Sequence, residues 1–318
     1  MAPALQDERH FGAGLARNAF VANGNTQVRP VKNIVLNVVA MMSAVSAVGT
    51  ASELRPDTLA AWQDYVQGAN ARLEESLRPG NSFMQVDRNP EACSRLLRGE
   101  VIVVPAVEVT PKNVPSGMIH DWRAAAFVPA VRVQDVLGVL HSYDEYREFY
   151  KPTVIDSHEL AGAENGEKFS LTFRNRSLLS HTAIEADYQS TYQQLDEKRW
   201  YSIVQATRIQ EIENYGREEE HKLDVGEGTG YVWRMQTIAR LEERDGGVYV
   251  EMEVIALSRD VPSSLRWIVG PMIRRYARNS LTSYMISTRD AVKSRCEAKQ
   301  NTSPHAPESG LTEAFRKR

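Results

Sequence analysis

The residues that could do chemistry are spread along this sequence without forming a known catalytic motif. The sequence contains no Gly-x-Ser-x-Gly nucleophile elbow, no His-Glu-x-x-His metal helix and no Walker-type phosphate loop. The glycine-rich residues 226–230 precede a predicted strand instead of opening a helix, which favours a loop over a phosphate site. We therefore predict no catalytic residues, no metal site and no cofactor, and we expect a binding protein rather than an enzyme.

Two cysteines, Cys93 and Cys296, limit the metal and redox chemistry. Neither belongs to a Cys-x-x-Cys pair, so a zinc site built on cysteines is not expected. In an exported protein the two could form one disulfide. The alternative is that each is a lone thiol, and both alternatives stay open at this point.

Two polar residues in predicted strands are candidates for contact with a ligand. His120 shares a strand face with Trp122 and could hydrogen-bond a ligand or transfer a proton; otherwise it is a structural histidine. Asp121 points to the opposite face, so an adjacent His–Asp dyad is not expected. Arg208 could bind a carboxylate as a fork, or it could pair with Glu on a solvated face.

Apolar side chains that alternate along neighbouring strands predict one covered face of a sheet. Large and small residues are mixed on that face, which is compatible either with a ligand pocket or with a filled core. The predicted ligand-binding residues lie on this face and on the helix that covers it: His120, Trp122, Val204, Arg208, Trp233, Met235, Met252, Val254, Met272 and Tyr276.

The elements that must position these residues follow from periodicity and turn signals. An apolar stripe predicts a helix over 55–77, and a second helix is expected over 90–97. Pro105 limits 101–109 to an edge strand or a bend. Further strands are predicted at 118–128, 153–160, 168–174, 178–188, 199–211, 230–242 and 248–258, with short helices over 133–149 and a long helix over 262–292.

This order predicts an α+β fold: a curved antiparallel sheet of about seven strands that grips a long C-terminal helix, with an N-terminal helical extension. Three stretches carry a resemblance to the START-like helix-grip superfamily, also called SRPBCC, of the polyketide cyclase and lipid-transfer type. They are GMIHDWRAAAFVP at 117–129, YDEYREFYKP at 143–152 and RDVPSSLRWIVGP at 259–271, which look like those of uncharacterised bacterial members. The resemblance implies a cavity between the sheet and the long helix that holds an apolar ligand.

An uncharged apolar run at 34–51 follows Lys32 and ends in small residues, which is the layout of a secretory signal. We predict export to the periplasm or the outside, with a retained membrane anchor as the alternative. Because residues 1–30 are unusual for a leader, translation starting at Val31 is a further hypothesis. The expected parts are the signal segment with its leader over 1–51, an extension over 52–115, the START-like domain over 116–295 and a disordered tail over 296–318.

The composition is that of a globular protein: 318 residues, 42% of them hydrophobic, with a net charge of −3. This balance argues against nucleic acid as a partner. The favoured function is binding or carrying a lipid or other hydrophobic small molecule, with contact to a membrane surface as a further expectation. The alternatives are a cyclase or aromatase that uses the same cavity, with His120, Arg208 and Tyr276 as its polar groups, and an envelope scaffold without a ligand.

Overall fold

The computed structural model describes residues 54–161, 166–174 and 182–302. The predicted signal segment at 34–51, the leader before it and the tail from 303 onwards lie outside the described residues, and so does the start of the strand expected at 178–188.

The N-terminal part forms two helices that begin with proline. Helix α2 spans Pro56–Leu77, and its buried Trp62, Ala69 and Leu73 lie on one side of the helix. After a 3-10 turn, η1 (Gln85–Arg88), helix α3 spans Pro90–Leu97. The Asn89 side chain caps α3 by accepting hydrogen bonds from the first backbone N–H groups. Both helices were predicted within one residue of these bounds.

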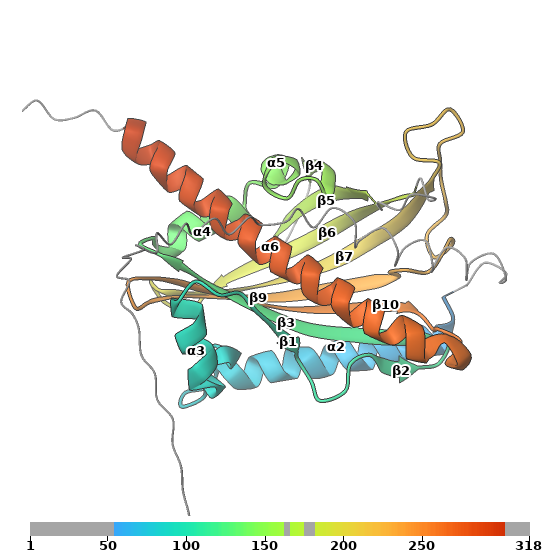
Figure 1. Cartoon of the computed structure of the whole chain (residues 1–318), viewed down its shortest axis with the longest axis horizontal. Coiled ribbons are helices and arrows are strands. Elements are labelled where there is room, and N and C mark those ends of the chain that lie inside the picture. The colour runs from blue at the N-terminus through green and yellow to red at the C-terminus, as the bar shows by residue number, and fades with distance from the viewer. Residues whose placement is uncertain (1–53, 162–165, 175–181, 303–318) are drawn as a thin grey trace, which may run out of the picture. The chain divides into compact units, whose positions relative to one another are not determined.

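The remaining elements follow the predicted order of strands and helices (Figure 1). Strand β3 leads into a short helical region, seven further strands follow, and the long helix α6 ends the described chain. Their bounds are β1 Ile102–Pro105, β2 Lys112–Val114, β3 Gly117–Pro129, α4 Val133–Leu140, η2 Tyr143–Glu145, α5 Tyr146–Phe149, β4 Val154–Leu160, β5 Glu167–Arg174, β6 Ala183–Gln194, β7 Arg199–Glu213, β8 His221–Lys222, β9 Arg234–Arg244, β10 Gly247–Arg259, η3 Ser263–Leu265 and α6 Arg266–Thr302.

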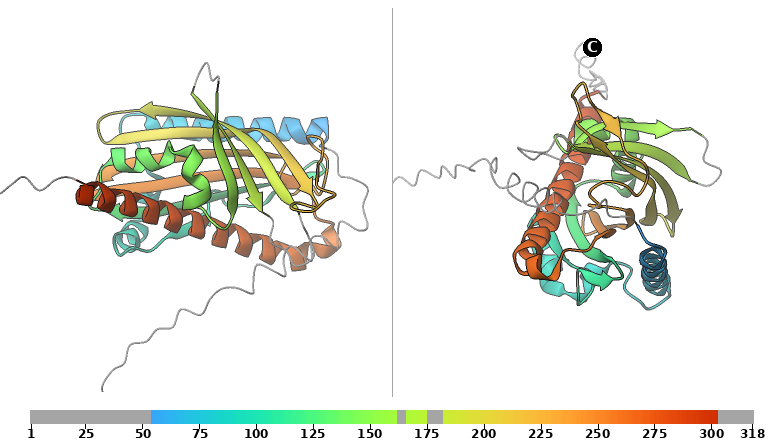
Figure 2. Two further views of the ribbon diagram at one scale, coloured as in Figure 1. Left: turned by 90° about the horizontal axis from the view of Figure 1, so that it is seen from above. Right: turned by 90° about the vertical axis from the view of Figure 1, so that its right-hand side faces the viewer.

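All strand pairs are antiparallel, and the order across the sheet is β1-β3-β10-β9-β7-β6-β5-β4. The short strands β2 and β8 pair with β3 and β7 and bring the sheet to ten strands. Strand β1 occupies an edge, as its Pro105 predicted. Helix α6 crosses one face of the curved sheet and α2 lies on the other (Figure 2). The predicted α+β helix-grip arrangement is confirmed.

The strand register assigns every side chain to one of these two faces. Val250 and Met252 pair with Ala126 and Ala124, and all four pack in a cluster that includes residues of α6. We call this side the α6 face. Ile255 lies three residues beyond Met252 on the same strand, so its side chain points to the other face, where it packs with Trp62 of α2; we call that side the α2 face.

Helix α6 is longer than expected. It runs from Arg266 past Val292 to Thr302, so residues 296–302, expected in the disordered tail, are helical instead. The apolar spacing ends near Val292 because the last turns extend past the sheet, where the exposed Glu297 and Gln300 need no buried face. No described helix is long and apolar enough to cross a membrane.

Candidate functional site

The two ends of the contact between α6 and the sheet are tightly packed. Near the N-terminus of the helix, Val269 packs against Met118 of β3 and Val261, and all three are buried. Towards the C-terminus, Met285 and Val292 are at most 1% exposed and lie in the large cluster on the α6 face. We call these two contacts the first and second anchor.

Between the anchors the helix covers the sheet incompletely. Tyr276 follows Val269 by seven residues and therefore lies on the same side of the helix. Val269 is 3% exposed, whereas Tyr276 is 50% exposed, so the sheet-facing side of the helix opens to water within two turns.

The sheet side of this region is partly exposed as well. Strand register places six partly accessible residues on the α6 face between the anchors: His120, Val204, Met235, Thr237, Val254 and Ala256. On the α2 face of the same strands, Gln236, Ile238 and Ile255 are buried. We call the six residues on the α6 face, together with Met272 and Tyr276 on the sheet-facing side of α6, the open section. Most of its surface is apolar, which is the chemistry of a site for a hydrophobic ligand.

His120 supplies a polar group in the open section. Its Nε2 lies 2.9 Å from the Ser258 hydroxyl oxygen. Burial lowers the pKa of His120 to about 4, so the imidazole is neutral at pH 7. A neutral imidazole can hydrogen-bond an uncharged ligand without the cost of burying a charge. Ser258 was not predicted, although Val254, Ala256 and Ser258 alternate on one face and could have indicated it.

Trp122 follows His120 on the same face and is 3% exposed. Its indole N–H is buried and has no hydrogen-bond acceptor among the described residues. A buried donor without a partner is costly, and an acceptor oxygen placed beside it removes that cost. The two neighbouring positions of β3 therefore offer one neutral imidazole and one unpartnered donor.

An aromatic cluster closes the open section on the side of β5 and β6. Tyr188 contacts the Met235 sulfur through its hydroxyl at 4.0 Å, and its ring stacks on Phe169 with centroids 5.1 Å apart. Tyr150 stacks on Tyr284 of α6 at 4.5 Å, and its hydroxyl lies 3.0 Å from the Thr288 hydroxyl. These tyrosines pack the helices against the sheet and form a rigid wall.

Two of the predicted ligand-binding residues do not lie where the sequence placed them. The first is Arg208, which lies on the side of the sheet opposite the α6 face. We call this the outer side, and there Arg208 pairs with Asp187 at 2.6 Å and Glu185 at 2.7 Å. A β-bulge between Asp187 and Tyr188 of the partner strand is the physical reason. The register shift puts both Ala206 and Ile209 on the α6 face. The alternation therefore reverses before Arg208 is reached.

The second correction concerns Trp233. It is buried on the α2 face with Trp62, Ile119 and Leu257, not on the α6 face with Met235. Strand β9 begins only at Arg234, and Gly230 just before it has a positive φ of 69°. The alternation that holds inside the strand therefore does not extend back to Trp233.

The other predicted residues lie on the expected elements, although they differ in burial. Met252 is 9% exposed and belongs to the second anchor, so it is packed core. Met272 is partly exposed on α6 and belongs to the open section. Both cysteines are free thiols, so the disulfide alternative was wrong: Cys93 lies in α3 and Cys296 in α6.

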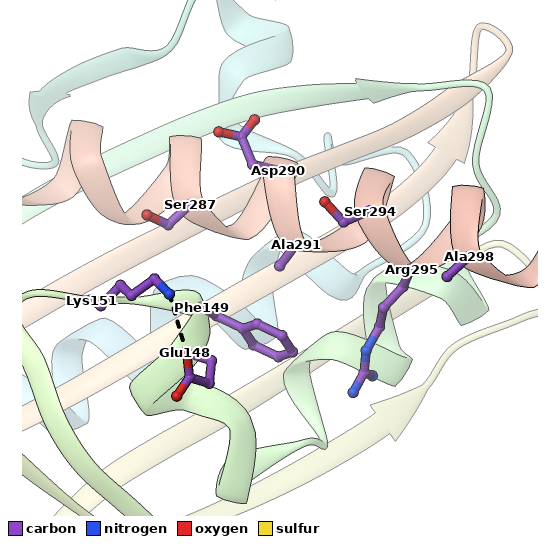
Figure 3. A pocket seen from close by; sticks show the side chains of 9 residues that line it. All are labelled: Glu148, Phe149, Lys151, Ser287, Asp290, Ala291, Ser294, Arg295 and Ala298. Atoms are coloured by element: carbon purple, nitrogen blue, oxygen red, sulfur yellow. Dashed lines mark hydrogen bonds and ion pairs between the residues drawn. The ribbon is translucent and has the colours of Figure 1, made fainter.

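A surface depression lies elsewhere, between α5 and the C-terminal half of α6 (Figure 3). Its volume is about 450 Å³, and Lys151 and Glu148 form an ion pair of 3.2 Å at its rim. It is lined by Glu148, Phe149, Lys151, Ser287, Asp290, Ala291, Ser294, Arg295 and Ala298. An enclosed cavity between the sheet and α6 stays a prediction, and what the structure shows there is the open section.

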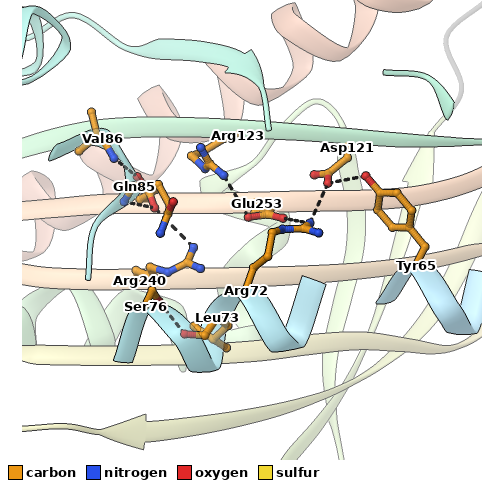
Figure 4. Close-up of polar contacts among 11 residues, drawn as sticks. Tyr65, Arg72, Leu73, Ser76, Gln85, Val86, Asp121, Arg123, Arg240 and Glu253 are labelled. Carbon is orange, nitrogen blue, oxygen red and sulfur yellow. Dashed lines mark hydrogen bonds and ion pairs between the residues drawn. The ribbon is translucent and has the colours of Figure 1, made fainter. Parts of the chain in front are cut away.

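The α2 face carries a cluster of buried charges (Figure 4). Glu253 accepts hydrogen bonds from Arg72 at 3.0 Å and from Arg123 at 3.3 Å. Asp121 accepts one hydrogen bond from Arg72 and another, of 2.8 Å, from the Tyr65 hydroxyl. Burial and the nearby Glu253 raise the pKa of Asp121 to about 6. These contacts join α2 to the sheet, so the cluster has a structural role.

A second part of the same cluster holds the segment before α3. Glu251 is fully buried and accepts from the backbone N–H groups of Gln85 and Val86 at 3.0 and 2.8 Å. Arg240 lies 3.4 Å from it and is also buried. Burial raises the pKa of Glu251 and lowers that of Arg240, because each charged form loses water.

Comparisons with known proteins find similarity to solved structures at low identity. No family model matches the sequence, and no curated protein is similar to it. A STAR-related lipid transfer protein fragment from Xanthomonas axonopodis is 16% identical, with a TM-score of 0.39 over 57% of this chain and 96% of that one. Human STARD10 is 12% identical, with a TM-score of 0.38 over 73% of this chain and 89% of that one.

The two-domain aromatase/cyclase StfQ from the steffimycin biosynthetic pathway is also similar, at 15% identity and a TM-score of 0.38 over 57% of this chain and 52% of that one. The arrangement of the antiparallel sheet and the long helix α6 is the one that the resemblance to START-like helix-grip proteins predicted. At these identities the likeness gives no information on the ligand or the reaction.

Proposed function

We propose that this protein binds or carries a lipid or another hydrophobic small molecule in the open section. The observation that supports this proposal is the difference between the two faces of β9 and β10. Apolar residues such as Val254 and Met235 are partly exposed on the α6 face, whereas Gln236, Ile238 and Ile255 on the α2 face of the same strands are buried. An incompletely covered apolar surface between two packed anchors gains free energy when an apolar molecule covers it.

The polar groups indicate the kind of ligand. Neutral His120 and the unpartnered indole N–H of Trp122 lie on one strand face. A ligand that is apolar over most of its length and carries one acceptor oxygen, as in a carbonyl, ester or hydroxyl group, matches this arrangement. A strongly charged headgroup does not match it, because Arg208 is paired on the other side of the sheet.

The cyclase alternative is not favoured by a specific observation. Of its three polar groups, Arg208 lies outside the open section, and His120 and Tyr276 remain. Export through residues 34–51, to the periplasm or the outside, is part of the proposal and rests on the sequence pattern alone.

Native mass spectrometry of the full chain, followed by solvent extraction, tests the proposal. We expect an apolar molecule to leave with the protein on extraction, and we expect the fluorescence of Nile red, an uncharged hydrophobic probe, to rise when the extracted protein is mixed with it. Ala256→Leu fills part of the open section and should weaken the binding of the probe.

Arg208→Gln is the matched control, because it changes a side chain on the opposite side of the same sheet. It should leave probe binding unchanged. The proposal fails if no molecule is extracted and the probe does not bind, or if both variants affect the probe equally.

A further inference from the structure

The part of α6 that spans the first anchor and the open section carries an unbalanced positive charge. Between Val261 and Arg289 the sequence contains no Asp or Glu, whereas Arg266, Arg274, Arg275 and Arg278 all lie within this stretch. Arg266 pairs with Asp260 at 2.8 Å. The other three guanidinium groups are exposed, and no carboxylate of the described residues pairs with them.

These three arginines lie on one side of the helix together with an exposed aromatic ring. Trp267 is 76% exposed, which is the largest exposure among the large hydrophobic side chains of the described residues. Residues 274, 275 and 278 follow it by seven, eight and eleven positions, a spacing that places all four on one side of an α-helix. The buried Val269 lies on a different side, towards the sheet.

The combination of an exposed indole and unpaired guanidinium groups matches the interfacial region of a lipid bilayer. Tryptophan is enriched at that depth because its ring is apolar and its N–H is polar. Arginines beside it are attracted to anionic headgroups, and each one contributes to binding. A nucleic acid would also attract the charges, but the chain carries a net charge of −3 and the aromatic residue stands alone at the end of the stripe.

We propose that the stripe formed by Trp267, Arg274, Arg275 and Arg278 docks this protein on an anionic phospholipid surface. The stripe lies on the outside of the same helix segment whose inner side borders the open section. Docking therefore brings that helix segment to the lipid surface. The proposal rests on exposure and charge, and it holds whether or not the open section binds a ligand.

Flotation of the full chain with vesicles tests the docking. Vesicles of phosphatidylcholine alone are compared with vesicles that also contain phosphatidylserine, at low and at high salt. We expect binding that depends on phosphatidylserine and weakens at high salt. Removing three surface charges in R274Q/R275Q/R278Q should lower the partition coefficient on the order of a hundredfold, and Trp267→Ala should lower it several-fold.

The triple variant R55Q/R78Q/R98Q is the matched control, because it removes the same charge from exposed arginines of the α2 and α3 region. All variants contain the apolar residues 34–51, so the difference between them isolates the stripe. Equal loss in both triple variants, equal binding to neutral vesicles, or tighter binding to duplex DNA than to anionic vesicles would overturn the proposal. Thermal unfolding and probe binding, both measured without vesicles, should stay unchanged and so separate docking from ligand uptake.

Discussion

The second anchor and the open section are two stretches of the same helix over the same sheet face, yet they differ in packing. At the second anchor Met285 and Val292 are buried, and α4 supplies a third layer through Val136 and Val139. No described element adds such a layer over the open section, where Tyr276 is half-exposed. A helix on a curved sheet leaves part of the sheet uncovered unless another element fills the space. This third layer, and not the hydrophobicity of the strands, therefore determines where a site can form.

Replacing one methionine in each stretch gives the largest expected contrast. Met285→Ala removes a fully buried side chain and should lower the free energy of unfolding by about 3 kcal/mol. Met272→Ala removes a partly exposed one and should cost less than about 1 kcal/mol. Urea unfolding of both variants measures the difference. Equal losses would mean that the two stretches are packed alike.

Enlarging one alanine in each stretch sharpens the same comparison. Ala124 is 0% exposed beside the second anchor, so Ala124→Leu should destabilise the protein by about 2 kcal/mol. Ala256 is partly exposed in the open section, so Ala256→Leu should be tolerated and should weaken probe binding instead. Thermal unfolding and fluorescence titration of the pair check this. A strongly destabilised Ala256→Leu variant would show that the open section has no spare room.

The pH dependence of stability tests how dry the open section is around His120. The pKa of His120 is lowered from 6.5 to about 4 by burial, so protonation favours the unfolded state. Its contribution to stability is complete above pH 6.5 and is lost as the pH falls towards 4. Relative to His120→Gln, the wild type should lose about 2 kcal/mol between pH 7 and pH 5.

Asp121 titrates in an overlapping range with the opposite sign, because its pKa is raised to about 6. Asp121 is present in both the wild type and His120→Gln, so its contribution to the pH dependence of stability cancels in the difference between them. An identical pH profile for the wild type and His120→Gln would mean that water solvates the imidazole freely.

The smallest effect is expected on the outer side of the sheet. Arg208 is partly exposed and pairs with Asp187 and Glu185, so Arg208→Gln should cost less than about 1 kcal/mol of stability. The loss should shrink at high salt, because exposed ion pairs are screened. Chemical unfolding at two salt concentrations measures it, and a loss of ligand uptake in this variant would contradict the assignment of Arg208 to the outer side.

Local sequence patterns were sufficient to predict most of the helices and strands and the faces on which their side chains lie. The apolar spacing of α2, the alternation along β10 and the position of Pro105 at an edge are local properties, and each followed from residue types and their period. Those same patterns placed His120, Met235 and Val254 on the face that α6 covers.

Which of these residues come together in a site depends on contacts between elements that are distant in the sequence. The bulge that turns Arg208 outward depends on pairing between two strands, and the position of Trp233 depends on the irregular chain before β9. Met252 is packed core and Val254 is partly open, although both alternate on one strand. The physical reason is that burial is set by what packs on top of a side chain, and the period of a strand carries no information on that.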